Sequence, residues 1–341
     1  MNPIELNDHL SEDALYPFTL TKSVLDLRIG ILTLREKWAL MSGHEIVVNH
    51  DKENGGLPAN MIPSIGLIEN IKKGNQDFAN EKRLTNPWEI FQLTDEAIRS
   101  DFNLLTKSRK SHPVSDTNHL ISPDCIFIEE GVKMEYVILN ASTGPIYISK
   151  NTEIMEGSIV RGPFFLGEGS VLKLSTKVYG ATSIGKKCVV GGEIKNSVFF
   201  DYSNKAHDGY IGDSVIGSWC NLGAGSSNSN LKNTAGIVKV WSQHDNAYQA
   251  AGAKCGLLLG DYSRSAINTS FNTGTVTGIC CNIFGSGLSP KHIPSFSWGY
   301  PVFGKYEIEK AIVDIANWKK LKNELLTDRE IQVLKHIFEK F

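Results

Sequence analysis

Residues 148–190 read ISKNTEIMEGSIVRGPFFLGEGSVLKLSTKVYGATSIGKKCVV, and every sixth residue of this stretch is aliphatic. A period of six fits neither the helical repeat nor the two-residue alternation of a strand. It predicts a prism of short parallel strands, in which each face contributes one inward residue and three faces make a coil of about 18 residues. The aliphatic column consists of Ile148, Ile154, Val160, Leu166, Leu172, Val178, Ile184 and Val190.

Glycine is frequent in this chain, which has 341 residues, 31 of them glycine and only 12 proline. The corners of a prism require residues that are small or that tolerate a left-handed backbone, and glycine meets both needs. Six glycines lie near the expected corners: Gly162, Gly167, Gly180, Gly185, Gly191 and Gly217.

The column slips after Val190, where a polar residue occupies the next expected position and Val198 takes its place. The spacing of six resumes two residues out of register at Ile216 and Leu222. We therefore expect an insertion or loop to leave the prism between about residues 199 and 210. Near the end of the prism, one column of mostly small residues comprises Gly260, Ala266, Asn272 and Gly278.

The patterning divides the chain into an N-terminal α/β domain, a linker, a β-helix and a helical tail. The predicted boundaries are 1–110 for an α/β domain, 111–125 for the linker, 126–290 for the β-helix and 291–341 for the tail. Because terminal coils of a solenoid need covering, the tail is expected to cap the prism or to pack on a neighbour. Residues 43–84 show no periodicity that assigns an element.

Several local signals predict helices. Thr85 and Asn86 are candidate caps for a helix from Trp88 to about Leu105. A second helix is expected over residues 307–321, and the segment from Thr327 to Glu330 matches a capping box before a third. In the N-terminal part, four residues are expected to point inward: Leu25, Ile29, Leu32 and Leu34.

Composition excludes several classes of function. The formal net charge is −2, which argues against a globally basic nucleic-acid binder. No apolar stretch is long enough for a membrane span, and the N-terminus lacks the pattern of a secretory signal, so we expect a cytoplasmic protein without a membrane partner. The six cysteines form no C-x-x-C pair and no zinc-type cluster with histidine, so we predict no metal site and buried thiols in a reducing compartment.

The densest group of candidate functional residues lies in residues 205–233, KAHDGYIGDSVIGSWCNLGAGSSNSNLKN. His207 stands in the predicted loop, and imidazole is well suited to accept a proton near neutral pH. The run from Gly223 to Gly225 could bring a backbone N–H close to a ligand oxygen. On residue types and spacing alone, the alternative is a tight corner with a solvated histidine. The remaining candidates are a lysine for a phosphate, Lys195, and three asparagines for a polyol: Asn221, Asn228 and Asn230.

The segment from Tyr210 to Gly225 (YIGDSVIGSWCNLGAG), with His207 three residues before it, resembles the C-terminal domain of a known enzyme family. This family comprises the bifunctional N-acetylglucosamine-1-phosphate uridyltransferase/glucosamine-1-phosphate acetyltransferases and their archaeal relatives. The resemblance covers about residues 126–285. It implies a left-handed β-helix of hexapeptide repeats that works as a homotrimer with active sites between subunits. LYPFTLT from Leu15 and NPWE from Asn86 are similar to motifs in the short N-terminal halves of Bacteroidetes-type members of this group. This resemblance implies that residues 1–110 are a degenerate, sugar nucleotidyltransferase-like α/β domain.

The resemblance implies a role for each matching residue. His207 would be the general base that deprotonates the sugar amine, and the Ala224 N–H would stabilise the oxyanion formed from the acetyl-CoA thioester. Lys195 would contact the sugar phosphate, and Lys177 stands where the family has an arginine in its phosphate-binding run. The sugar site would be lined by Tyr210, Asn221 and Asn230.

Three hypotheses follow. The first is an acetyl-CoA-dependent N-acetyltransferase acting on an amino-sugar phosphate such as glucosamine-1-phosphate. The second is a sugar-1-phosphate nucleotidylyltransferase that uses a nucleoside triphosphate and Mg²⁺ in the N-terminal half. Residues 8–14, DHLSEDA, lack the glycines with which a nucleotide-binding loop cradles phosphates, and this favours the first hypothesis. The third is a non-catalytic trimeric scaffold that binds a sugar nucleotide.

Overall fold

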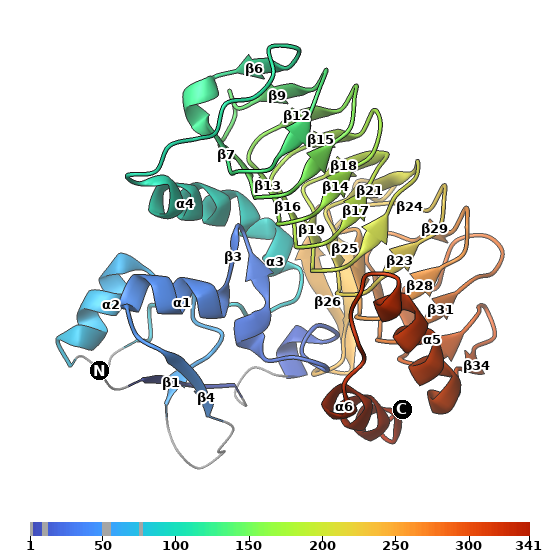
Figure 1. The fold of residues 1–341 in the computed structure, drawn as a ribbon. Helices are drawn as coiled ribbons and strands as arrows, with labels where there is room; N and C mark the ends of the chain where they lie inside the picture. The colour runs from blue at the N-terminus through green and yellow to red at the C-terminus, as the bar shows by residue number, and fades with distance from the viewer. Residues whose placement is uncertain (1–2, 9–12, 50–55, 75–77) are drawn as a thin grey trace.

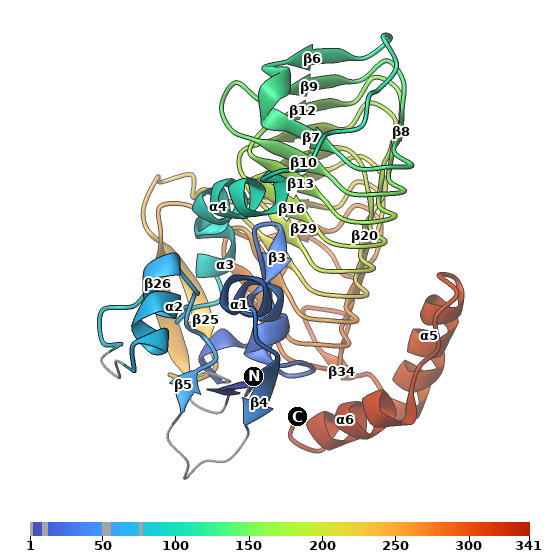
Figure 2. The same ribbon diagram turned by 60° about the vertical axis from the view of Figure 1, so that its left-hand side comes forward.

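A computed structural model describes residues 3–8, 13–49, 56–74 and 78–341. A long β-helix carries an N-terminal unit against one face and a pair of C-terminal helices at its side (Figure 1). The same stack is seen from another side in Figure 2, with β6 at one end and β34 at the other. Within the described ranges, no helix combines the length and the apolar character needed to cross a bilayer.

Three sheets form the faces of a left-handed parallel β-helix, as predicted. The nine-stranded sheet contains β7 Ile126–Ile128, β10 Ile146–Ile148, β13 Phe164–Leu166, β16 Thr182–Ile184, β19 Val198–Phe199, β22 Val215–Ile216, β27 Leu257–Leu259, β30 Thr275–Thr277 and β32 His292–Ile293. The ten-stranded sheet contains β8 Lys133–Met134, β11 Glu153–Ile154, β14 Val171–Leu172, β17 Val189–Val190, β20 Asn204–Lys205, β23 Asn221–Leu222, β28 Arg264–Ser265, β31 Asn282–Ile283, β33 Ser297–Trp298 and the antiparallel β34 Gly304–Lys305.

The third face is shorter. The six-stranded sheet contains β6 His119–Ile121, β9 Ile138–Asn140, β12 Ile159–Arg161, β15 Lys177–Tyr179, β18 Glu193–Lys195 and β21 Tyr210–Gly212, and the pair β24 Ser227–Asn228 and β29 Ser270–Phe271 follows. All eight residues of the aliphatic column are buried, each at most 2% exposed. The spacing of six therefore predicted the interior of the prism correctly.

The predicted insertion between residues 199 and 210 is wrong. β19, β20 and β21 pair within the three sheets, so this stretch belongs to the prism. The slip has another cause, because one coil is short: Val171 pairs with Val189, an 18-residue step, but Val189 pairs with Asn204, a 15-residue step. The next step, from Asn204 to Asn221, is 17 residues.

The chain leaves the prism further on, between β24 and β27. This excursion contains the antiparallel hairpin of β25 Val238–Ser242 and β26 Ala247–Gly252. Its apolar residues join the core shared with the N-terminal unit, and Gln92 donates a hydrogen bond to the Ala251 carbonyl at 3.0 Å. The repeat then resumes, and its inward positions lie one residue earlier than the predicted small-residue column. Leu259, Phe271 and Ile283 are in the core.

The corner glycines serve two different needs. Gly180 has a left-handed backbone with φ of 68°, as expected for a corner. Gly167 does not, but a Cβ there would lie 2.5 Å from the carbonyl carbon of Gly185 in the next coil. The close stacking of coils therefore requires glycine at Gly167 even though its φ does not.

In its described residues, the N-terminal unit contains a small parallel sheet and the helices α1 to α4. The sheet has the order β4–β1–β5, with β1 Ile4–Asn7, β4 Ile46–Asn49 and β5 Leu57–Pro58. The other elements are the hairpin β2 Arg28–Ile29 and β3 Leu32–Thr33, the 3-10 turns Asp13–Leu15 and Val24–Asp26, and the helices α1 Leu34–Ser42, α2 Ile65–Lys72, α3 Glu89–Gln92 and α4 Thr94–Thr106, whereas the 3-10 turn Pro123–Cys125 lies between β6 and β7 of the β-helix. Most of residues 8–14, whose lack of glycine bears on nucleotide binding, lie outside the described ranges.

The N-terminal unit and the β-helix share one core. The outward residues of the nine-stranded sheet, including Val198, Val215 and Val276, pack with N-terminal residues such as Leu25 and Trp38. Of the four residues predicted to point inward, Leu25, Ile29 and Leu34 are fully buried, whereas Leu32 is half-buried. The unit therefore covers this face of the prism (Figure 1).

The predicted caps at Thr85 and Asn86 are wrong. The Glu89 carboxylate instead accepts hydrogen bonds from their backbone N–H groups, at 2.7 and 3.0 Å. The single helix expected from Trp88 to Leu105 is also divided, because α3 ends before Leu93 and α4 follows it.

The tail forms α5 Ile308–Lys320 and α6 Asp328–Phe338, and the capping box at Thr327 is present. These helices lie over one corner of the last coils, where the residues have left-handed φ values of 54–68° although none is glycine. The tail contacts this corner directly, because Tyr262 donates a hydrogen bond to Glu330 at 3.2 Å and the rings of Phe296 and Phe338 meet edge to face. The corner residues are Lys187, Tyr202, Trp219, Tyr262, Cys280 and Phe296.

Candidate functional site

His207 lies at the corner between β20 of the ten-stranded sheet and β21 of the six-stranded sheet, and its side chain is exposed. The pairing of Asn204 with Asn221 makes Ala224 the equivalent residue of the next coil. The Gly225 N–H donates to the Asp208 carbonyl at 2.9 Å, which confirms that the two corners stack. Neighbouring strands of a sheet are about 4.8 Å apart, so the two backbones run side by side at that spacing.

The preceding corner is shorter. Only Gly191 and Gly192 separate β17 from β18, whereas four residues, 206–209, separate β20 from β21. Gly192 has a φ of 78° and Gly209 a φ of 121°, backbone conformations that favour glycine. The corner that carries His207 is therefore longer than the equivalent corner of the preceding coil, whereas the corner of the following coil stacks on it.

Both groups predicted to act on the substrate are available to a ligand. Within the described part of the chain, the His207 imidazole makes no hydrogen bond. The Ala224 N–H also donates to no acceptor there, although the Ala224 carbonyl accepts from the Asn268 N–H at 2.7 Å. A free N–H at a tight corner is a donor of the kind that stabilises an oxyanion.

Tyr210 and Asn230 meet on the six-stranded face. The Asn230 amide donates to the Tyr210 hydroxyl at 3.0 Å and also to the Asp213 carboxylate. Asp213 accepts a further hydrogen bond from Asn196 at 2.7 Å. Burial, reinforced by the Asp213 carboxylate, raises the pKa of Tyr210. The tyrosine is therefore a neutral hydroxyl held in a polar network.

The two predicted phosphate-binding lysines lie further along the same face. The Lys195 ammonium is 6.0 Å from the centre of the Tyr179 ring. Lys177 pairs in register with Glu193 and lines a shallow cavity of about 420 Å³. Asn221 does not join this group, because it lies on the ten-stranded face between Asn204 and Arg264.

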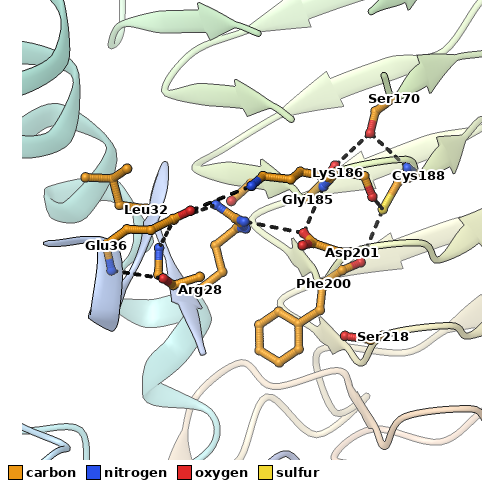
Figure 3. Close-up of polar contacts among 12 residues, drawn as sticks. Arg28, Leu32, Glu36, Ser170, Gly185, Lys186, Cys188, Phe200, Asp201 and Ser218 are labelled. Atoms are coloured by element: carbon orange, nitrogen blue, oxygen red, sulfur yellow. Dashed lines mark hydrogen bonds and ion pairs between the residues drawn. The ribbon is translucent and has the colours of Figure 1, made fainter. Parts of the chain in front are cut away.

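Sequence reasoning missed a cavity of about 590 Å³ between the N-terminal unit, the β-helix and α6. Lys22 donates there to Ser218 at 2.7 Å and lies 2.8 Å from Asp261. Beside it, Arg28 reaches across to Asp201, with 3.4 Å between their atoms, as Figure 3 shows. These partners lie more than 170 residues apart in the chain, so no local motif could have brought them together.

A metal site was not predicted and none is assigned. Among the described residues, no three His, Cys, Asp or Glu side chains are grouped so that they could hold a metal ion.

Five of the six free thiols are buried as expected, but the expectation is wrong for Cys125, which is exposed.

The fold and this corner define a β-helix protein of the hexapeptide-repeat class. Residues 5–51 match the sugar nucleotidyl transferase family. The "Bifunctional protein GlmU" of Cyanothece sp. strain PCC 7425 is 28% identical over 164 residues, which cover 42% of this chain and 36% of that protein. The protein of the same name from Methanocaldococcus jannaschii is 32% identical over 108 residues, 32% of this chain and 26% of that protein. The chain is thus a relative of the bifunctional GlmU proteins, and the predicted resemblance is confirmed.

The matches have limited extent. The chain spans about a third of the length of the curated relatives it matches. Among solved structures, the polySia-specific acetyltransferase NeuO is matched with a TM-score of 0.32 at 12% identity, covering 56% of this chain and 87% of that one. A UDP-N-acetylglucosamine acyltransferase is matched with a TM-score of 0.22 at 11% identity, covering 65% of this chain and 86% of that one.

Proposed function

We propose that the chain is an N-acetyltransferase that moves the acetyl group of acetyl-CoA to the amine of a sugar phosphate, with glucosamine-1-phosphate as the first substrate to test. The observation that carries the proposal is the stacking of His207 on Ala224 in consecutive coils. It places on one edge of the prism an imidazole and a backbone N–H that have no hydrogen-bond partner among the residues the structure describes. The relationship to the bifunctional GlmU proteins supports the same class of reaction.

The chemistry needs only these groups. The amine nitrogen attacks the thioester carbonyl carbon while His207 accepts a proton from the amine. The carbonyl oxygen becomes an oxyanion that the Ala224 N–H stabilises. When the carbon–sulfur bond breaks, His207 returns the proton to the leaving thiolate. Lys195 and Lys177 would hold the sugar phosphate, and Tyr210 and Asn230 the sugar.

The proposal includes a homotrimer assembled through the six-stranded face. No helix covers this face in the described part of the chain, and it presents several exposed apolar side chains. Such a surface is typical of an interface between subunits. A trimer would place a neighbouring chain beside the His207 corner. The exposed residues are Tyr136, Ile138, Ile159, Leu174 and Tyr179.

The surface proposal is tested by charge substitution. Ile159→Glu places a carboxylate in this face and should convert the trimer to monomers in analytical ultracentrifugation. Val313→Glu, which alters an exposed residue of α5, should leave the trimer intact. A wild-type monomer, or a trimeric Ile159→Glu protein, would contradict the assigned interface.

The catalytic proposal is tested with acetyl-CoA and glucosamine-1-phosphate, by measuring the release of coenzyme A thiol and the mass of the product. His207→Ala should lower turnover by about 10²- to 10⁴-fold, the usual contribution of a general base. His244→Ala is the matched control, because His244 is exposed in the turn between β25 and β26. The assignment fails if His207→Ala retains wild-type turnover.

A second candidate function is nucleotidyl transfer by the N-terminal unit, and the match of residues 5–51 favours it. The 590 Å³ cavity beside this segment is lined by Thr21, Lys22 and Arg35 and is a candidate site for a nucleotide. This function requires Mg²⁺-dependent release of pyrophosphate from a nucleoside triphosphate and a sugar-1-phosphate. If neither reaction occurs but acetyl-CoA or a sugar nucleotide raises the melting temperature, the protein is a binding scaffold.

The free thiols agree with the expected cytoplasmic location.

A further inference from the structure

A lysine occupies an interior position of the β-helix. The register aligns Lys205 with Val190 in the preceding coil and places Leu222 beside it in the following one, and Leu172 lies two coils before Lys205 in the same inward column. The Lys205 side chain is only 1% exposed. Burial lowers its pKa to about 8, against the opposing effect of the Asp208 carboxylate. A buried ammonium is costly, so an aliphatic residue would suit the core better at this position.

The Lys205 ammonium group lies between the short corner at Gly191 and Gly192 and the long corner at residues 206–209. It donates to the Gly191 carbonyl of the short corner at 3.1 Å and to the His207 carbonyl of the long corner. A Cβ on Gly192 would lie 2.9 Å from the ammonium nitrogen and 2.9 Å from the His207 carbonyl oxygen. The lysine therefore fills the space that the two missing residues leave open.

Three consecutive carbonyls anchor the His207 corner from three directions. The Asp208 carbonyl accepts from the Gly225 N–H of the following coil at 2.9 Å, and the Gly209 carbonyl accepts from the Glu193 N–H of the preceding coil at 3.1 Å. The His207 carbonyl accepts from Lys205 inside the prism. Only this third anchor is a side chain, so only this one can be removed by substitution.

We infer that Lys205 is a positioning residue, which holds the His207 backbone in register with Ala224 of the following coil. The inference rests on the proposed function for its catalytic consequence, but the hold on the corner is a property of the fold. It explains why a cation interrupts an aliphatic column at the one coil that carries the candidate base.

Lys205→Met tests the inference, because it restores an apolar residue of similar length to the column. Leu172→Met is the matched control, a change of similar volume two coils earlier in the same column. Lys205→Met should lower kcat by about 10- to 100-fold, the effect of a small misplacement of a catalytic group, and leave KM within about twofold. Its melting temperature should not fall, whereas a purely structural lysine would change melting and leave kcat intact.

Amide hydrogen exchange measured on peptides containing Glu193 and Gly225, whose N–H groups donate to the Gly209 and Asp208 carbonyls of the His207 corner, gives a readout independent of turnover. Exchange there should accelerate in Lys205→Met and stay unchanged in Leu172→Met. If the wild-type protein transfers no acetyl group, the proposed function fails. The exchange result still shows whether Lys205 anchors the His207 corner. Unchanged exchange and unchanged kcat in a folded Lys205→Met protein would overturn the inference.

A second variant covers the case in which Lys205→Met does not fold. Gly192→Ala keeps the lysine but places a methyl group against its ammonium nitrogen and against the His207 carbonyl. It should lower kcat and accelerate amide exchange at Glu193 and Gly225, as Lys205→Met does. Wild-type kcat and wild-type exchange in this variant would also overturn the inference.

Discussion

The buried ion pair between Lys37 of α1 and Asp101 of α4 allows a quantitative test of how the N-terminal unit is held together. The two side chains are 5% and 4% exposed. Lys37→Met removes the cation and leaves a carboxylate in the core. Breaking a buried pair in this way costs about 3–5 kcal/mol. Asp101 still accepts hydrogen bonds from the Ile31 and Leu32 N–H groups, at 2.9 and 3.1 Å, so we expect the lower end, about 3 kcal/mol.

Helix α4, which carries Asp101, also supplies a control. Lys82 pairs with Glu96 of α4, but these side chains are 47% and 73% exposed. Lys82→Met should cost less than about 1 kcal/mol, because water screens an exposed pair. Urea denaturation followed by the fluorescence of buried Trp38 measures both free energies of unfolding. Equal losses in the two variants would refute the assignment of the energy to the buried pair.

The pH dependence of the Lys37→Met variant adds a second check. Burial raises the pKa of Asp101, and the cation that lowers it is gone in the variant. The folded variant then binds a proton at a higher pH than the unfolded chain does, so its free energy of unfolding rises as the pH falls toward the raised pKa. The difference from wild type should therefore be smaller at pH 5 than at pH 8.

Three further predictions follow from burial. A thiol reagent should label Cys125 rapidly in the native protein and the other five cysteines only on unfolding, because burial raises their pKa. Burial against Trp241 lowers the pKa of His292 to about 4, so the free energy of unfolding should fall as the pH drops from about 6.5 towards 4, and His292→Phe should flatten this dependence in urea titrations. Gly167→Ala would drive a methyl group into the Gly185 backbone, and calorimetry should show a loss of about 1–3 kcal/mol.

The interior of the β-helix was predictable because one physical rule acts at every sixth residue. Ile148 and Val190 face the same core, and burial selects the same kind of side chain at both. The position of the chain excursion was not predictable in this way. The coil that is shortened at Gly191 and Gly192 puts the aliphatic column out of register, as an insertion would also do. The sequence pattern shows that the register changes but not whether residues were lost or added. The hairpin at residues 238–252 consequently went unrecognised.

The candidate site was predictable only where it is local in sequence. His207 and Ala224 were chosen separately, and the 17-residue step that stacks them became visible only in the strand pairing. Asn221 was grouped with the sugar site because the family resemblance implied that role, yet in this chain it lies on another face than Tyr210. Lys205 attracted no attention, because a lysine beside a loop is ordinarily solvated. Its burial depends on the short corner of the preceding coil.

The shared core of the N-terminal unit and the nine-stranded sheet has a consequence for synthesis on the ribosome. Leu25 and Trp38 are made early, but the core around them is completed by Val215, Leu258 and Val276. At 5–20 residues per second, roughly 12–50 s separate Leu25 from Val276 during translation. Throughout that interval the nascent N-terminal segment exposes an unfinished apolar surface, which makes it a client for chaperones until the last coils emerge.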